Sequence, residues 1–158
     1  MILAQRLQDE LKAAMRRQDA LRRDTLRMAL AAAYNAEKQA RRPLSDDELI
    51  GVLVREVKTR RESVEAYEGA GRADLAAKER TEISILESFL PPPLSPDELR
   101  LLVRETITET AANSTRDLGR VMGALAPRTR GRADGRTVSR LVSEELARLA
   151  GGSGEAPG

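Results

Sequence analysis

The chain has 158 residues and contains no cysteine, no histidine and no tryptophan. Without cysteine it has no disulfide, no thiolate nucleophile and no thiolate ligand for a metal. Without histidine it lacks the usual general base near neutral pH and the commonest metal ligand. We therefore expect neither a metal site nor a cofactor. Aromatic residues make up only 2% of the chain, so the core must be built from aliphatic side chains.

Long apolar runs are also absent. No stretch approaches the roughly 20 consecutive apolar residues of a membrane-spanning helix. The first seven residues, Met-Ile-Leu-Ala-Gln-Arg-Leu, reach a charge before a signal-peptide-like apolar run can form. These two observations predict a chain that does not bind membranes and that is located in the cytoplasm.

The abundant residue types and their spacing are typical of helices. Charged residues make up 33% of the chain, and no run of alternating apolar residues predicts a strand. Apolar residues recur instead at helical spacing. The sequence therefore predicts an all-α fold with helices near residues 2–17, 20–40, 46–68, 73–89, 96–110, 115–127 and 135–149.

Three consecutive prolines, Pro91 to Pro93, mark the strongest break, because proline cannot continue a helix. We predict an N-terminal four-helix domain over residues 1–92, a small three-helix tail domain over 93–150 and a flexible tail over 151–158. Capping residues support the starts of four helices. Asp19 precedes the second helix, and Ser45 and Ser95 precede the third and fifth, each with a glutamate three residues later. Ser114 precedes the sixth, with Asp117 at the same spacing.

The third predicted helix carries charges of both signs at spacings of four. Glu56 and Arg60 form one such pair, and Arg61 and Glu65 form another. Residues four apart are neighbours on a helix surface. The pattern predicts a solvated face stabilised by ion pairs within the helix.

Positive charge is concentrated near the C-terminus. The whole chain carries a net charge of +2 and residues 1–94 carry +1, whereas residues 113–142 hold seven basic and two acidic side chains, net +5. Locally concentrated charge is what electrostatic recognition of a polyanion requires. The candidate phosphate-binding residues in this segment are Arg116, Arg120, Arg128, Arg130, Arg132 and Arg136.

The same segment is rich in glycine. Gly119 and Gly123 are four residues apart and share one helix face, which a second backbone could approach closely. Gly131 and Gly135 bracket a short basic turn, in which Asp134 is placed to cap the next helix. Two interpretations stay open: glycines that pack helices beside solvated arginines, or a smooth basic surface that faces phosphates.

Several motifs resemble a known family. Met122-Gly123-Ala124-Leu125, then Pro127, then Arg130 to Gly135 resemble the core of the GatB/YqeY tail domain. The resemblance to stand-alone YqeY proteins covers residues 2–149. Upstream segments carry it too: Leu26-Arg27-Met28, Lys58-Thr59-Arg60-Arg61-Glu62-Ser63, Ala70-Gly71-Arg72 and Phe89-Leu90-Pro91.

The resemblance implies contact with tRNA. In the glutamine-dependent tRNA amidotransferase, the tail domain of the B subunit is understood to hold tRNA near its elbow, which is recognised by shape and backbone. By that resemblance, the six arginines named above contact RNA, and Gly119, Gly123, Gly131 and Gly135 provide close approach and turns. The C-terminal part has no aromatic residue that could stack on a base.

Two other functions remain open at this stage. One is a protein–protein adaptor that docks on a translation enzyme through the N-terminal helices. The other is the label often given to the family, carbon–nitrogen ligase activity with glutamine as the amido-nitrogen donor. The sequence offers no catalytic residue for the ligase reaction. Its acid pairs, such as Asp46-Asp47 and Asp97-Glu98, lie where helix first turns are predicted, where they complement the helix dipole. We therefore expect no catalysis by the chain alone.

Overall fold

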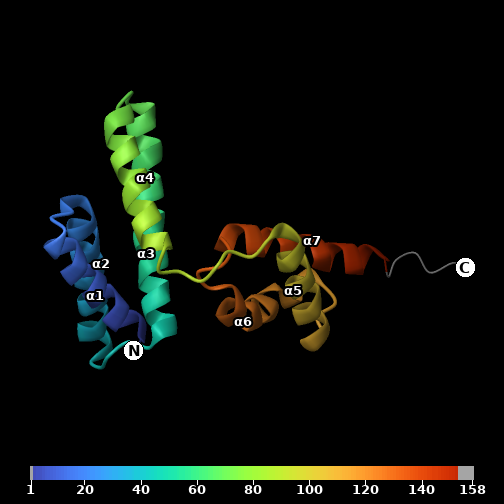
Figure 1. Cartoon of the computed structure of the whole chain (residues 1–158). Coiled ribbons are helices and arrows are strands. Elements are labelled where there is room, and N and C mark those ends of the chain that lie inside the picture. Colours follow the sequence, from blue (N-terminus) through green and yellow to red (C-terminus); the bar gives the residue numbers. More distant parts are fainter. Residues whose placement is uncertain (1, 153–158) are drawn as a thin grey trace, which may run out of the picture. The chain divides into compact units, whose positions relative to one another are not determined.

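The structure, a computed structural model, describes residues 2–152 and is entirely helical over that range (Figure 1). This confirms the predicted all-α class. The helices are α1 (Ile2–Arg16), α2 (Ala20–Ala40), α3 (Asp46–Gly69), α4 (Ala73–Glu87), α5 (Pro96–Glu109), the 3₁₀ turn η1 (Thr115–Asp117), α6 (Leu118–Thr129) and α7 (Gly135–Gly152).

Helix α7 is longer than predicted. It continues through Gly151 and Gly152, so the predicted flexible tail does not begin at residue 151. Ala150 is a strong helix former and the next proline is Pro157, so no strong breaker stops the helix at Leu149. The rest of the predicted tail, residues 153–158, lies outside the described residues.

Contacts divide the chain into two compact units, Met1–Pro91 and Pro92–Gly158. In the first unit α1 packs on α2, and α3 and α4 lie side by side as a helical hairpin (Figure 1). Leu7, Leu26, Leu53 and Leu86 are fully buried in its core. Whether each unit folds as an independent domain stays a prediction.

All but one of the predicted helix caps are present. The exception is the cap predicted at Ser114 and Asp117, where neither side chain caps a helix and the turn η1 comes before α6. The Ser45 hydroxyl accepts a hydrogen bond from the Glu48 N–H, and the Glu48 carboxylate accepts one from the Ser45 N–H. Two hydrogen bonds from Arg42, of 2.7 and 2.9 Å, are the main reason why the pKa of Glu48 falls to about 2. Asp19 and Ser95 cap α2 and α5 in the same way, each through the N–H three residues on. These local signals explain why the helix starts could be predicted from sequence.

The charges of α3 differ from the prediction. Arg60 does pair with Glu56, at 2.9 Å, but its side chain is buried, because α4 covers it and supplies Glu82 at 3.0 Å. Arg61 pairs with Glu87 of α4 at 2.8 Å and not with Glu65. The four-residue spacing rule considers one helix alone and leaves out residues of neighbouring helices. The prediction of a solvated face was therefore wrong at Arg60.

The second unit is built from α5, α6 and α7. Its core contains Val103, Val121, Leu125, Val142 and Leu146, all fully buried. The segment before α5 joins this unit, since the Leu94 N–H donates to the carbonyl of Arg132 at 2.8 Å. This bond anchors the basic turn between α6 and α7.

Candidate nucleic-acid interface

Helix α6 presents its two glycines to solvent. Val121 and Leu125 face the core, and Gly119 and Gly123 lie on the exposed side. A Cβ added at either glycine would meet no atom within 4 Å. Packing inside the chain therefore does not require these glycines. Each costs about 1 kcal/mol of helix stability relative to alanine, so helix stability does not explain their presence either.

Small residues extend this open face. Ala124 and Pro127 are exposed beside Gly123, and Arg120 is exposed beside Gly119. Because Pro127 has no N–H, the carbonyl of Gly123 lacks the donor that normally comes from four residues further along a helix. The face therefore combines close access to the backbone with an acceptor that suits an external donor, such as a ribose hydroxyl.

The basic turn has a fixed backbone. Gly131 has φ of +74°, a left-handed conformation that glycine adopts without strain. The Asp134 carboxylate accepts a hydrogen bond from the Thr137 N–H at 3.2 Å and caps α7, as the sequence predicted. Gly135 is the first residue of α7, and a Cβ there would again meet nothing within 4 Å.

Three of the six predicted arginines are held by their own chain. Arg128 donates to Glu109 at 3.1 Å and to the Thr106 hydroxyl at 3.2 Å. Arg120 pairs with Asp117 at 3.2 Å, and Arg132 donates to the carbonyl of Pro92 at 3.1 Å. Sequence reasoning considered only acids close in sequence and so missed Glu109, which α5 brings to Arg128.

The other three arginines are available. Within residues 2–152, Arg116, Arg130 and Arg136 are exposed and make no ion pair. Arg130 follows α6, Arg136 begins α7, and Arg116 lies in the turn before α6. Because these three side chains have no acidic partner, they are the arginines to which a phosphate has free access.

The pair of Arg120 with Asp117 is maintained by the backbone. The N–H of Asn113 holds the pKa of Asp117 below its usual range, so this carboxylate stays charged beside Arg120.

A metal-holding group and a membrane-spanning helix are both absent from the described part of the chain. No group of three or more acidic residues there is arranged to hold a metal ion. Among residues 2–152, no helix has the length and apolar character needed to cross a membrane.

The open glycine face leads to the first prediction. Gly123→Ala should stabilise α6 by about 0.5–1 kcal/mol, because the new methyl group meets nothing and alanine is the better helix former. Hydrogen exchange of the amides of residues 118–129 in the full chain should slow accordingly. Gly123→Leu should keep the helix but lower affinity for any ligand that docks on the face. Faster exchange in the alanine variant would show that Gly123 serves the fold and not binding.

Comparison with known proteins places the sequence in a family. The sequence pattern described as Yqey-like protein matches residues 4–146. A protein of Pyrenophora tritici-repentis named "Altered inheritance of mitochondria protein 41, mitochondrial" is 30% identical over 146 residues, which cover 90% of this chain and 80% of that protein.

Two more relatives have the same name. The one from Vanderwaltozyma polyspora is 30% identical over 106 residues, covering 65% of this chain and 57% of that protein. The one from Eremothecium gossypii is 33% identical over 96 residues, covering 59% and 52%. All three are named as mitochondrial proteins, which contradicts the cytoplasmic location predicted from the sequence. That prediction rested on the lack of a membrane-spanning run and of an apolar signal-peptide run, and neither pattern reports on mitochondrial targeting.

Proposed function

Since the chain belongs to the YqeY-like protein family, we propose that it binds structured RNA, with tRNA as the first RNA to test, without catalysing a reaction. The family is that of the tail domain of the tRNA amidotransferase B subunit. The observations that carry the proposal are three exposed, unpaired arginines, one before α6, one after it and one at the start of α7, together with the open face of α6. We define this interface by Arg116, Gly119, Gly123, Arg130 and Arg136.

The chemistry of the interface favours the RNA backbone over the bases. Guanidinium groups bind phosphate oxygens through charge-assisted hydrogen bonds, and phosphate contacts position a nucleic acid without reading its sequence. The chain's three aromatic residues, Tyr34, Tyr67 and Phe89, all lie before residue 92. The second unit therefore offers no ring for base stacking, and recognition by shape is the mode its residues support.

A protein–protein adaptor is the second candidate, and one observation favours it. Met28 is 57% exposed and Tyr34 is 61% exposed on α2. With Ala31 between them at a spacing of three residues, they lie on one side of the helix. A helix of a translation enzyme with a complementary apolar face fits such a surface. Amidotransferase activity is not proposed, because the acid pairs of α3 and α5 do lie in helix first turns.

Binding of tRNA to the full chain over a range of salt concentrations tests the RNA function. Three phosphate contacts at the interface should contribute about −2 to −3 to the slope of a plot of log affinity against log salt. An unstructured RNA of equal length serves as the control for shape and should bind more weakly. If tRNA affinity is absent or independent of salt, the RNA function is wrong and the adaptor function replaces it.

A further inference from the structure

Positive charge is concentrated in a second place, at the corner between α1 and α2. Residues 10–27 carry six basic and three acidic side chains, net +3, while residues 113–142 carry net +5. The rest of the chain has 14 basic and 20 acidic side chains, net −6. The corner and the interface of α6 are therefore two basic segments of the chain, and they lie on different units. The corner's basic residues are Lys12, Arg16, Arg17, Arg22, Arg23 and Arg27.

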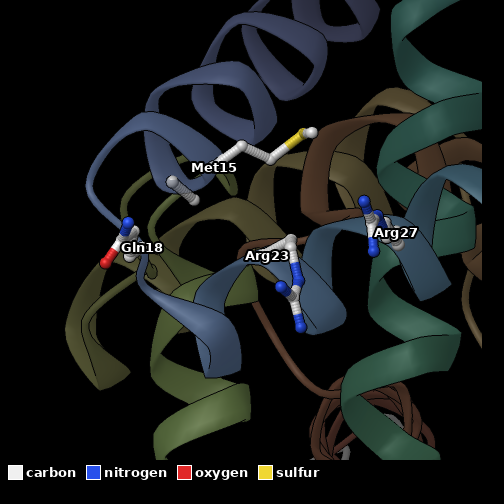
Figure 2. Close-up of a pocket in the computed structure, with 5 residues that line it drawn as sticks. Met15, Gln18, Arg23 and Arg27 are labelled. Carbon is white, nitrogen blue, oxygen red and sulfur yellow. The ribbon is translucent and has the colours of Figure 1, made fainter.

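The corner also contains a pocket. A cavity of about 190 Å³ lies between the end of α1 and the start of α2, and two arginines line it. Figure 2 shows Arg23 and Arg27 on α2, Met15 on α1 and Gln18 in the connecting turn. Gln18 has φ of +56°, a left-handed conformation that costs a non-glycine residue about 1–2 kcal/mol. The turn thus combines two guanidinium groups, an amide and a thioether around one opening.

The acids of this corner are already engaged by the chain. Glu10 pairs with Arg22 at 3.0 Å, and Asp19 caps α2. Asp24 pairs with Arg23 at 2.9 Å. Within residues 2–152, Lys12, Arg16 and Arg27 make no ion pair. The corner therefore keeps excess cationic groups after its own acids are satisfied, as the interface of α6 does.

We propose that the α1–α2 corner is a second phosphate site for the same RNA, with a backbone phosphate between Arg23 and Arg27 and the adjoining sugar against Met15. Arg23 and Arg27 are four residues apart on one face of α2 and both line the pocket, so a phosphate bound there would lie beside two guanidinium groups. Met15 is 49% exposed and provides a soft apolar wall. This inference rests on the proposed RNA function.

Two sites on two units change how an RNA is held. Once one unit is bound, the other meets the same RNA at the effective concentration set by the connection between them. Each site is then weak alone and the pair is strong together. Occupation of both sites requires a single RNA to present phosphates to both, which favours a folded RNA over a short strand.

The test compares two double variants of the full chain. Arg23→Gln with Arg27→Gln removes the pocket's charges, and Arg55→Gln with Lys58→Gln removes two exposed charges of α3 in the same unit. The pocket variant should flatten the salt slope of tRNA binding by about 0.7–0.9 units through the lost contact of Arg27. Arg23 should add less, because Asp24 already holds its guanidinium. The control should leave the slope unchanged. An equal effect in both variants would mean diffuse surface charge and would overturn the inference.

A direct reading of the pocket comes from its methionine. The chain has four methionines, so a spectrum of ¹³C-labelled methionine methyl groups is simple, and Met15→Leu assigns the signal. The Met15 methyl should shift when tRNA is added to the wild type and should not shift in the Arg23, Arg27 double variant.

The outcomes separate the inference from the proposed function. If tRNA binds with the expected salt slope but Met15 does not move and the pocket variant matches the control, the second site is wrong and the proposed function stands. If the wild type does not bind tRNA, both are wrong. A Met15 signal that responds to phosphatidylserine vesicles but not to tRNA would make the corner a lipid-facing surface and would also overturn the inference.

Discussion

Arg60→Ala is expected to lower the free energy of unfolding of the N-terminal unit by about 3–5 kcal/mol, the usual cost of removing one partner of a buried ion pair. Arg60 is only 4% exposed and Glu82 is only 8% exposed. The Arg60 Nε donates to the Glu82 carboxylate at 3.0 Å, and a second nitrogen donates to the Glu56 carboxylate at 2.9 Å. Without the guanidinium, Glu82 is left as a buried charge with only Lys78, 3.9 Å away, as its partner.

The residues around Glu82 do little to stabilise its charge, since one of its neighbours is the acidic Glu79. Burial, together with the nearby charge of Glu82, already raises the pKa of Glu79. Arg60 also donates to the carbonyl of Glu56 at 3.1 Å and to the Met28 sulfur of α2 at 3.8 Å. The variant must therefore expose Glu82 by loosening the α3–α4 hairpin or protonate it at a free-energy cost.

Tyrosine fluorescence measures the effect in the intact chain. Both tyrosines lie in the first unit and there is no tryptophan, so urea unfolding followed at this signal reports on that unit alone. Arg61→Ala is the matched control, because Arg61 is on the same helix and also pairs with α4, but through an exposed pair. An exposed pair contributes less than about 1 kcal/mol.

A double variant tests the physical reason. Arg60→Met with Glu82→Leu replaces the buried pair by apolar side chains and should recover most of the lost stability. If Arg60→Ala costs no more than Arg61→Ala, or if the double variant is as unstable as the single one, the buried pair does not hold the hairpin.

Local signals explain what could be predicted from the sequence. Ser45, Ser95 and Asp19 each act within three residues, and Pro91 to Pro93 break the chain wherever they occur. The starts of α2, α3 and α5 follow from such features alone. Ion pairs between helices cannot be predicted from local signals, because Glu82 is 22 residues from Arg60 and Glu109 is 19 residues from Arg128. Only the packing of one helix against another brings them together.

The two basic surfaces illustrate the same limit in different ways. The arginines of residues 113–142 stood out by count, but the structure was needed to divide them into paired and unpaired groups. The corner at residues 10–27 was hidden because its charge was averaged over residues 1–94, where acids of α3 and α4 offset it. A count over a window of about 20 residues would have found it. A count of charges cannot show that Gly119 and Gly123 face solvent, which the structure does show.

That division of the arginines gives the last prediction. We compare the unpaired set, Arg116, Arg130 and Arg136, with the paired set, Arg120, Arg128 and Arg132, each replaced by glutamine in the full chain. Replacing the unpaired set should flatten the salt slope of tRNA binding by about 2–3 units, since each lost phosphate contact removes about 0.7–0.9. Both variants change the net charge by the same amount, so long-range attraction falls equally in the two.

The paired set should change the slope by less than about one unit, because carboxylates and carbonyls of the chain already hold those guanidinium groups. Its effect should fall on the fold instead, through the lost contacts of Arg128 with α5 and of Arg132 with the segment before it. Circular dichroism checks that each variant is folded before its affinity is measured. If the two sets flatten the slope equally, RNA senses only total charge and the interface of α6 is not a specific one. If only the unpaired set does so, contact with phosphate depends on which arginines the fold leaves free.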